Sequence, residues 1–438
     1  MITAQDIAAQ GPAPFPNTQR APAHAALLPQ RLLNIVLFIT VLSSSVVFIQ
    51  PAPYDGFIWL LGIACLIAGV TVDRKVTPLL LLLLIWNFSG FFALMPVLDR
   101  PNTPSFIGIS LYLAVTAVLF ACVFAQDSVK RLSVMRTAYI LSALLTTVTG
   151  VMGYFNMFPG AHNIFTFSER ASATFKDPNV FGPFLILPLL FLIERIIVVG
   201  VRLRDFVCTL VLLFGLLLSF SRGAWGHFGL SAALMLGLMF VTSQNRQSRF
   251  RIAAFGLVVL IASAILFIVV IQIDAVSEML LKRASLLQDY DVKPGGRFDI
   301  QAKSMEQMLL NPNGLGPFEM ARRFGLASHN TYLGTMLQYG WIGGLTYLTL
   351  TLLTLALGFR AVLIRTPWQS YLIAAYATYV GLVLESFIID TDHWRHYYLV
   401  LGIVWGLVTA TSNHVRSRQM SVPVGYAPAS LSTPARIH

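Results

Sequence analysis

The chain has 438 residues, of which 56% are hydrophobic and 11% charged, and its mean hydropathy is +0.72. A soluble globular protein carries about twice that charged fraction, so this composition excludes an ordinary soluble domain. Several apolar runs approach the ~20 residues that cross ~30 Å of hydrocarbon. The sequence therefore predicts an all-α, polytopic membrane helix bundle.

The two ends of the chain are predicted to be disordered tails. Residues 1–30 are rich in proline and alanine and nearly uncharged, and they lack the basic start and short apolar core of a cleavable signal peptide. Residues 412–438 form a second polar stretch with few large apolar residues. We expect residues 31–411 between these tails to form one transmembrane domain.

Apolar runs separated by polar breaks predict about twelve membrane-spanning helices. The longest break, residues 274–328, predicts one long loop, and loops of that length are usually functional or disordered. No internal repeat is recognisable, which argues against a transporter built from repeats. In chain order, the apolar runs lie near residues 32–49, 57–72, 77–97, 105–125, 136–157, 180–194, 205–220, 224–242, 252–273, 335–359, 369–388 and 396–411.

The basic residues indicate the orientation of these spans. With both termini on one side, that side holds 18 of the 30 lysine and arginine residues but only 5 of the 19 acidic ones. Basic loops stay in the cytoplasm, so both termini are expected to be cytoplasmic and the long loop 274–328 periplasmic. The net charge of +11 then follows from topology, and no nucleic-acid partner is needed to explain it.

Four arginines stand out on the predicted outer side, one just before a span, one in a turn between two spans and two in the long loop. Such arginines often extend to lipid headgroups without a further role, but the turn that carries Arg222 is too short to be an ordinary solvated loop. Guanidinium groups that converge on one outer cavity would bind a phosphate or diphosphate, because their planar fork matches an oxyanion. The four candidates for binding a lipid-linked diphosphate are Arg170, Arg222, Arg283 and Arg297.

A histidine precedes the tenth predicted span, in the stretch "SHNTYLGTMLQYGWIGG". Asn330 or Ser328 can cap the helix that follows, and Gly340 and its glycine neighbours permit close helix packing. A loop histidine is commonly just solvated, but the positive end of a helix disfavours the imidazolium form. His329 would then stay neutral and able to accept a proton from an acceptor hydroxyl.

The segment "DTDHWRHYY" before the last predicted span is rich in polar side chains. Asp390, Asp392, His393 and His396 can in principle ligate a divalent ion. We favour two alternatives to a metal site: the segment is a polar outer turn with Tyr397 and Tyr398 at the membrane interface, or Asp390 or Asp392 orients His329 or an arginine. We therefore predict no metal and no cofactor. Glu385, inside the eleventh span, is expected to pair with one of the arginines.

The three cysteines of the chain all fall inside apolar runs. A disulfide framework needs cysteines in aqueous loops on the oxidising side of the membrane. We therefore predict that Cys65, Cys122 and Cys208 are unpaired.

Four segments, in chain order between residues 165 and 345, resemble motifs of the O-antigen ligase and polymerase family of bacterial envelope proteins. "RASATFKDPNVFG" is similar to the family's arginine and Asp-Pro-Asn segment, and "SFSRGAW" to its Ser-Arg-Gly turn. "GGRFDIQAKSMEQMLLNPNGLGPFEM" resembles its loop with Gly-Arg, Asn-Pro and Gly-x-Gly. The last segment matches a His-Asn pair, nine further residues, and then a glycine, here His329–Asn330 and Gly340.

This resemblance implies a metal-independent, inverting glycosyltransferase of the bacterial inner membrane, with a periplasmic active site. Its donor would be a glycan linked to undecaprenyl diphosphate, and its other partners would be membrane lipids. Carried over onto this chain, Arg222 and Arg297 would hold the diphosphate, with Arg170 and Arg283 as secondary candidates. His329 would activate the acceptor, with Asn330, Asp390 and Asp392 in support.

The acceptor is not determined by the sequence, and three functions remain open. An O-antigen ligase would transfer the glycan to lipid A-core, in lipopolysaccharide biosynthesis. A polymerase of O-antigen or exopolysaccharide would use a growing glycan as acceptor, with the same fold and donor. A transporter or flippase for lipid-linked sugars belongs to a different class, and it would be expected to carry ionisable groups near mid-membrane and broken helices related by a repeat.

Overall fold

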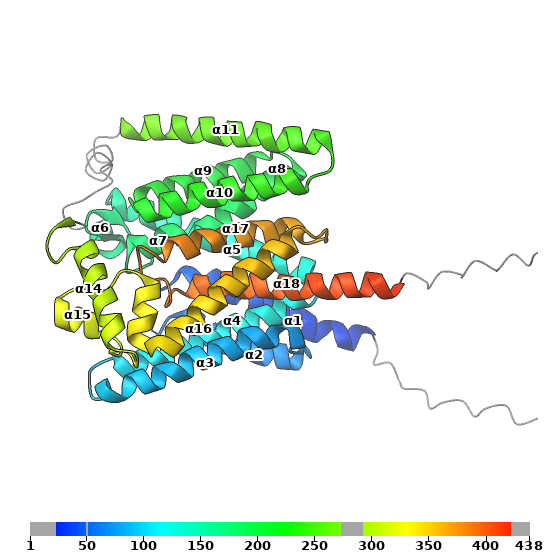
Figure 1. The fold of residues 1–438 in the computed structure, drawn as a ribbon. Coiled ribbons are helices and arrows are strands. Elements are labelled where there is room, and N and C mark those ends of the chain that lie inside the picture. Colours follow the sequence, from blue (N-terminus) through cyan, green and yellow to red (C-terminus); the bar gives the residue numbers. More distant parts are fainter. Residues whose placement is uncertain (1–22, 50, 273–291, 422–438) are drawn as a thin grey trace, which may run out of the picture.

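The computed structural model describes residues 23–49, 51–272 and 292–421, which form a bundle of helices running up and down past one another (Figure 1). Within these residues, eight helices are long and apolar enough to cross a membrane by length and composition, and Pro53–Ile67 is a shorter apolar helix. Each predicted apolar run overlaps a helix, and α7 and α8 together cover the run at 180–194. The all-α class is confirmed, whereas the count of twelve spans stays a prediction.

The first half of the chain contributes five long or medium helices and a small outer subdomain. The helices are α1 (Ala23–Leu42), α2 (Pro53–Ile67), α3 (Thr77–Leu94), α4 (Thr103–Ala125) and α5 (Ser128–Tyr154), with the 3₁₀ turns η1 (Ser43–Ser45), η2 (Arg74–Val76) and η3 (Met95–Val97). The subdomain consists of α6 (Ala161–Phe165) and two short antiparallel strands, β1 (Thr166–Phe167) and β2 (Arg170–Ala171).

The second half of the chain completes the bundle and adds two helices at one end of it. The bundle helices are α7 (Pro178–Phe184), α8 (Ile186–Val199), α9 (Leu203–Leu218), α10 (Arg222–Thr242), α11 (Arg246–Ile271), α16 (Thr331–Val362), α17 (Gln369–Glu385) and α18 (Arg395–Ser421). The described part of the long loop predicted at 274–328 contains α14 (Arg297–Leu310) and α15 (Glu319–Phe324).

The beginning and end of the described chain lie at one end of the bundle. α1 begins and α18 finishes there, while α6, α14 and α15 lie at the opposite end (Figure 1). This arrangement agrees with the expected placement of both termini on one side of the membrane. The long loop and the "SFSRGAW" turn then share the other side.

Two boundaries differ from the predicted tails. α1 begins at Ala23, inside the segment expected to be disordered, and α18 continues to Ser421, past the expected end at residue 411. Hydropathy marks only the part of a helix that lies in hydrocarbon. Helical propensity continues through residues such as Ala25 and Arg416, which are good helix formers.

The bundle is held together by close contacts between helices. α18 packs along α4, where Gly402 and Gly406 lie against Ala117 and Ala121 so closely that a side chain at either glycine would collide with the α4 backbone. Small residues four positions apart allow helix backbones to approach in this way inside a membrane. The three cysteines are unpaired, as predicted.

α16 is bent at Gly340, whose φ of 72° lies in the left-handed region. The helix ladder breaks there, and the loop around Asn313 inserts into the gap. The amides of Leu315 and Gly316 donate to the carbonyl of Leu337 at 2.6 and 3.1 Å, and the Trp341 amide donates to Pro312 at 2.8 Å. The predicted role of the glycine in helix packing is therefore wrong for Gly340, because it forms a kink that anchors the outer loop.

Replacement of Gly340 by alanine is expected to lower the thermal stability of the purified protein. An alanine Cβ would sit 2.9 Å from the backbone of Asn313 and would have to adopt a positive φ, which together cost about 1–3 kcal/mol or more. Gly62 is a matched control, because it is helical and nothing lies within 4 Å of the place where its Cβ would be. Gly62→Ala should be neutral or stabilising. Equal melting temperatures for the two variants would contradict this account of the kink.

Candidate active site

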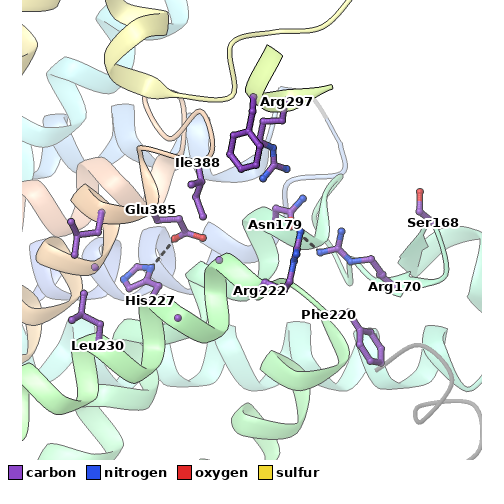
Figure 2. A pocket seen from close by; sticks show the side chains of 15 residues that line it. Ser168, Arg170, Asn179, Phe220, Arg222, His227, Leu230, Arg297, Glu385 and Ile388 are labelled. Carbon is purple, nitrogen blue, oxygen red and sulfur yellow. Dashed lines mark hydrogen bonds and ion pairs between the residues drawn. The ribbon is translucent and has the colours of Figure 1, made fainter. Parts of the chain in front are cut away.

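A cavity of about 560 Å³ lies at the end of the bundle that carries α6 and α14, where α10, α14 and α17 meet the loop around β2 (Figure 2). Three of the four arginines singled out in the sequence, Arg170, Arg222 and Arg297, line it. They come from β2 and from the first residues of α10 and α14. Arg283, the fourth, lies outside the described residues.

Arg222 is positioned in the cavity by the sharp turn that precedes α10. Phe220 has a φ of 46°, which turns the chain sharply after α9. Ser221 then caps α10 through its hydroxyl, which accepts from the Ala224 amide at 3.3 Å. Arg222 is thus the first residue of a 21-residue helix, and the positive end of that helix adds to the attraction of the guanidinium for an anion.

Arg170 is a buried arginine that joins three elements around the cavity. Its Nε donates to the carbonyl of Ser219 at 2.9 Å, and its Nη2 donates to Oδ1 of Asn179 at 2.8 Å. Asn179 is itself placed by Asp177, which caps α7. These bonds fix β2 against the end of α9 and the start of α7, so Arg170 is more than a cation that extends to a lipid headgroup.

Arg297 connects the cavity with His329. It is the first residue of α14, and one turn later Gln301 donates from Nε2 to the backbone carbonyl of His329 at 3.1 Å. The positive charge of Arg297 also contributes to lowering the pKa of His329. α14 therefore contributes Arg297 to the cavity and Gln301 to the histidine loop.

The loop that carries His329 is held by backbone contacts on both sides. His329 has a φ of 45°, an uncommon conformation for a residue other than glycine. Asn330 caps α16, as predicted, because its Oδ1 accepts from the amides of Tyr332 and Leu333 at 3.0 and 3.1 Å. The Thr331 amide donates to the carbonyl of Ser386 at 2.8 Å. The start of α16 is thereby tied to the segment that follows α17.

Asp390 lies beside His329 because of these ties. Its Oδ2 is 3.7 Å from Nδ1 of His329, and the two side chains are 30% and 32% exposed. Burial, and then the charge of Arg297, lower the pKa of His329. Burial and the neighbouring Asp392 raise the pKa of Asp390 to about 7. The expectation of a neutral imidazole agrees with this geometry, and partial burial and the charge of Arg297 both favour it.

If His329 acts as the base expected from the sequence, the rate of the reaction at this site should rise with pH in two steps. His329 is a neutral base only above its pKa, which lies below the usual 6.5, and Asp390 is ionised only above about pH 7. An ionised carboxylate stabilises the imidazolium that forms when the histidine takes a proton. Asp390→Asn should therefore remove the step near pH 7 and leave only the lower one. An unchanged pH–rate profile in that variant would show that ionisation of Asp390 does not affect the reaction.

The remainder of the "DTDHWRHYY" segment forms structural contacts. Nδ1 of His393 is 2.9 Å from Oδ2 of Asp392, and its ring lies 3.9 Å from that of Phe106. His396 is buried in α18 and packs against Trp394. Among residues 23–272 and 292–421, apart from residue 50, no group of three or more His, Cys, Asp or Glu side chains is arranged to hold a metal ion.

Glu385 pairs with a histidine that the sequence analysis passed over, whereas we expected an arginine. His227 lies on α10, and its Nδ1 is 2.8 Å from Oε2 of Glu385 (Figure 2). Both residues line the cavity. The sequence gives little sign of this pair, since the two residues are far apart in the chain and a histidine in an apolar helix is not distinctive.

Comparison with known protein families supports the resemblance drawn from the motifs. The comparison with curated proteins gave no match. The family model described as O-antigen ligase matches residues 207–348, about a third of the chain. The matched segment includes Arg222, Arg297 and His329. This match agrees with the resemblance drawn from the motifs, and it is limited to residues 207–348.

Proposed function

We propose that the protein transfers a glycan from undecaprenyl diphosphate to an acceptor hydroxyl at the periplasmic face of the bacterial inner membrane. The observation that carries this proposal is the convergence of Arg170, Arg222 and Arg297 on one cavity, while α14, which begins with Arg297, contacts the His329 loop through Gln301. Three guanidinium groups can bind the oxygens of a diphosphate, and a neutral imidazole can accept the proton of an acceptor hydroxyl.

The cavity fits an amphiphilic anion better than a free sugar phosphate. Besides the arginines, its wall includes apolar side chains, among them Leu230, Leu384 and Ile388. A polyprenyl chain can lie against such side chains while its diphosphate contacts the arginines. Both requirements are met by one class of donor, a lipid-linked diphosphate sugar.

In the proposed reaction, the acceptor oxygen attacks the anomeric carbon of the donor sugar as its proton passes to His329. The bond between that carbon and the diphosphate oxygen breaks, and the electron pair leaves with undecaprenyl diphosphate. Arg222 and Arg297 stabilise the negative charge that develops there. A single displacement inverts the configuration at the anomeric carbon. No step needs a metal, so transfer should continue in the presence of a divalent chelator.

The acceptor decides between a ligase and a polymerase, and we favour the ligase. Purified protein is incubated with a labelled lipid-diphosphate oligosaccharide and either lipid A-core or a second donor molecule. A single labelled glycolipid, formed only with lipid A-core, supports a ligase. A ladder of products formed with donor alone supports a polymerase, and the absence of both products would overturn the proposal.

A further inference from the structure

A buried pair of titratable side chains forms one wall of the cavity, opposite the arginines (Figure 2). The side chains of His227 and Glu385 are 0% and 2% exposed. Nδ1 of the histidine is 2.8 Å from Oε2 of the glutamate, and its Nε2 is 3.0 Å from the carbonyl oxygen of Thr378. The proposed reaction uses neither residue.

The contact with Thr378 fixes where the protons of the pair lie. A carbonyl oxygen only accepts hydrogen bonds, so Nε2 of His227 must carry a proton and donate it. The contact between Nδ1 and Oε2 then holds a single shared proton. Whether that proton is on the imidazole or on the carboxyl group, the pair has no net charge, and the second oxygen, Oε1, is left as an acceptor.

Oε1 lies close to the first turn of α10, which carries Arg222. It is 3.0 Å from the position that a Cβ of Gly223 would occupy, and Gly223 directly follows Arg222. In Figure 2 the carboxyl group of Glu385 lies between His227 and the side of the cavity that carries Arg222. Gly381 of α17 leaves the room that the imidazole ring fills, because a side chain there would collide with the ring.

Oε1 in this position cannot form a hydrogen bond with the phosphate groups themselves. Phosphate oxygens are acceptors too, and they would be repelled by Oε1 at the distance at which they meet Arg222. A hydroxyl or amide N–H of the ligand can donate to it. On a sugar diphosphate, the nearest such donor to the phosphates is the substituent on carbon 2, next to the anomeric carbon.

We propose that Glu385, held by His227, recognises the first sugar of the donor by accepting a hydrogen bond from its carbon-2 substituent at Oε1. This inference rests on the proposed function, since it assumes that the diphosphate occupies the arginines. It assigns the substrate class more narrowly: a polyprenyl diphosphate whose first sugar carries a hydroxyl or an acylated amine on carbon 2.

The test compares three ligands on detergent-purified, full-length protein. They are undecaprenyl diphosphate without sugar, the same lipid carrying one hexose with a free 2-hydroxyl, and its 2-deoxy form. Wild-type protein should bind the hydroxylated form about two- to tenfold more tightly than the 2-deoxy form, the range for a hydrogen bond to a group without net charge. Equal binding of the two sugars by wild type would overturn the inference without any variant.

Variants assign that preference to Glu385. Removal of one partner of a buried pair is disruptive, whereas its replacement by apolar residues of similar volume is often tolerated. The double variant His227→Leu/Glu385→Leu should bind the hydroxylated and 2-deoxy forms with the same affinity. Glu194→Gln is the matched control, because Glu194 is a buried glutamate that pairs with Arg136 away from the cavity. It should keep the wild-type preference.

The outcomes separate this inference from the proposed function. Wild-type protein that fails to bind undecaprenyl diphosphate contradicts the proposed function itself. Protein that binds this lipid, and in which the double variant keeps the preference for the 2-hydroxyl, contradicts only the role of Glu385. If the double variant does not fold, as shown by its melting temperature, Glu385→Gln replaces it and should reduce the preference several-fold.

Discussion

Replacement of His329 by alanine is expected to reduce glycan transfer by about 10²–10⁴-fold, the usual contribution of a positioned general base. Donor binding should change little, because His329 does not line the arginine cavity. Burial and Arg297 also lower its pKa, so the neutral ring adds no positive charge that would attract the diphosphate. The measurement is single-turnover transfer of a labelled lipid-diphosphate glycan, together with the affinity of the protein for undecaprenyl diphosphate.

A matched control for this variant is His162→Ala. His162 lies on α6 at the same end of the bundle, is similarly exposed, at 35%, and pairs with an exposed glutamate. It should keep wild-type activity. Full activity of His329→Ala would contradict the assignment of the base. A loss of donor accumulation at the periplasmic face of cells carrying the variant would indicate a flippase instead, because a transferase defect leaves the donor outside.

The architecture was largely predictable from the sequence because hydrophobic burial in a membrane leaves a strong local signal. Apolar runs of the right length mark helices one by one, and each run predicted here overlaps a helix. Convergence of Arg170, Arg222 and Arg297 could be anticipated because all three were predicted on one side of the membrane, two near span ends and Arg297 in the long loop. Charges at that depth are costly and usually functional.

Contacts between distant segments were not predictable in the same way. The kink at Gly340 exists because the loop around Asn313 supplies partners to the interrupted helix ladder. The glycine alone does not distinguish a kink from close helix packing. In the same way, Asp390 lies beside His329 only because Thr331 is tied to Ser386. Hydropathy and motif spacing contain no information on such pairings.

The pair of His227 and Glu385 illustrates the same limit more sharply. A carboxylate near a helix end among several arginines is expected to pair with an arginine, since that ion pair has the strongest hydrogen bonds. The partner is decided instead by which face of α10 packs against α17. Two glycines, Gly223 and Gly381, leave room for the pair there, and their role becomes visible only once the two helices are placed together.

Replacement of Arg222 or Arg297 by alanine is expected to weaken binding of undecaprenyl diphosphate by about 2–5 kcal/mol, roughly 30- to 5,000-fold. Each guanidinium lines the cavity, and its loss leaves part of the diphosphate charge without a partner. Replacement by lysine should recover only part of the affinity, because an ammonium group keeps the charge but not the planar fork.

Arg323→Ala is the control for these two variants. Arg323 lies on α15 at the same end of the bundle, but its partner is Glu319 and it does not line the cavity. Its loss should leave affinity unchanged at physiological salt, where a general electrostatic attraction over ~8 Å and beyond is screened. If all three variants weakened binding equally, the attraction would come from the net charge of the outer surface, and the cavity would have no specific role. If Arg222→Lys and Arg297→Lys bound the lipid as tightly as wild type, positive charge alone would hold the diphosphate, and the bidentate hydrogen bonds of the two guanidinium groups would not be needed.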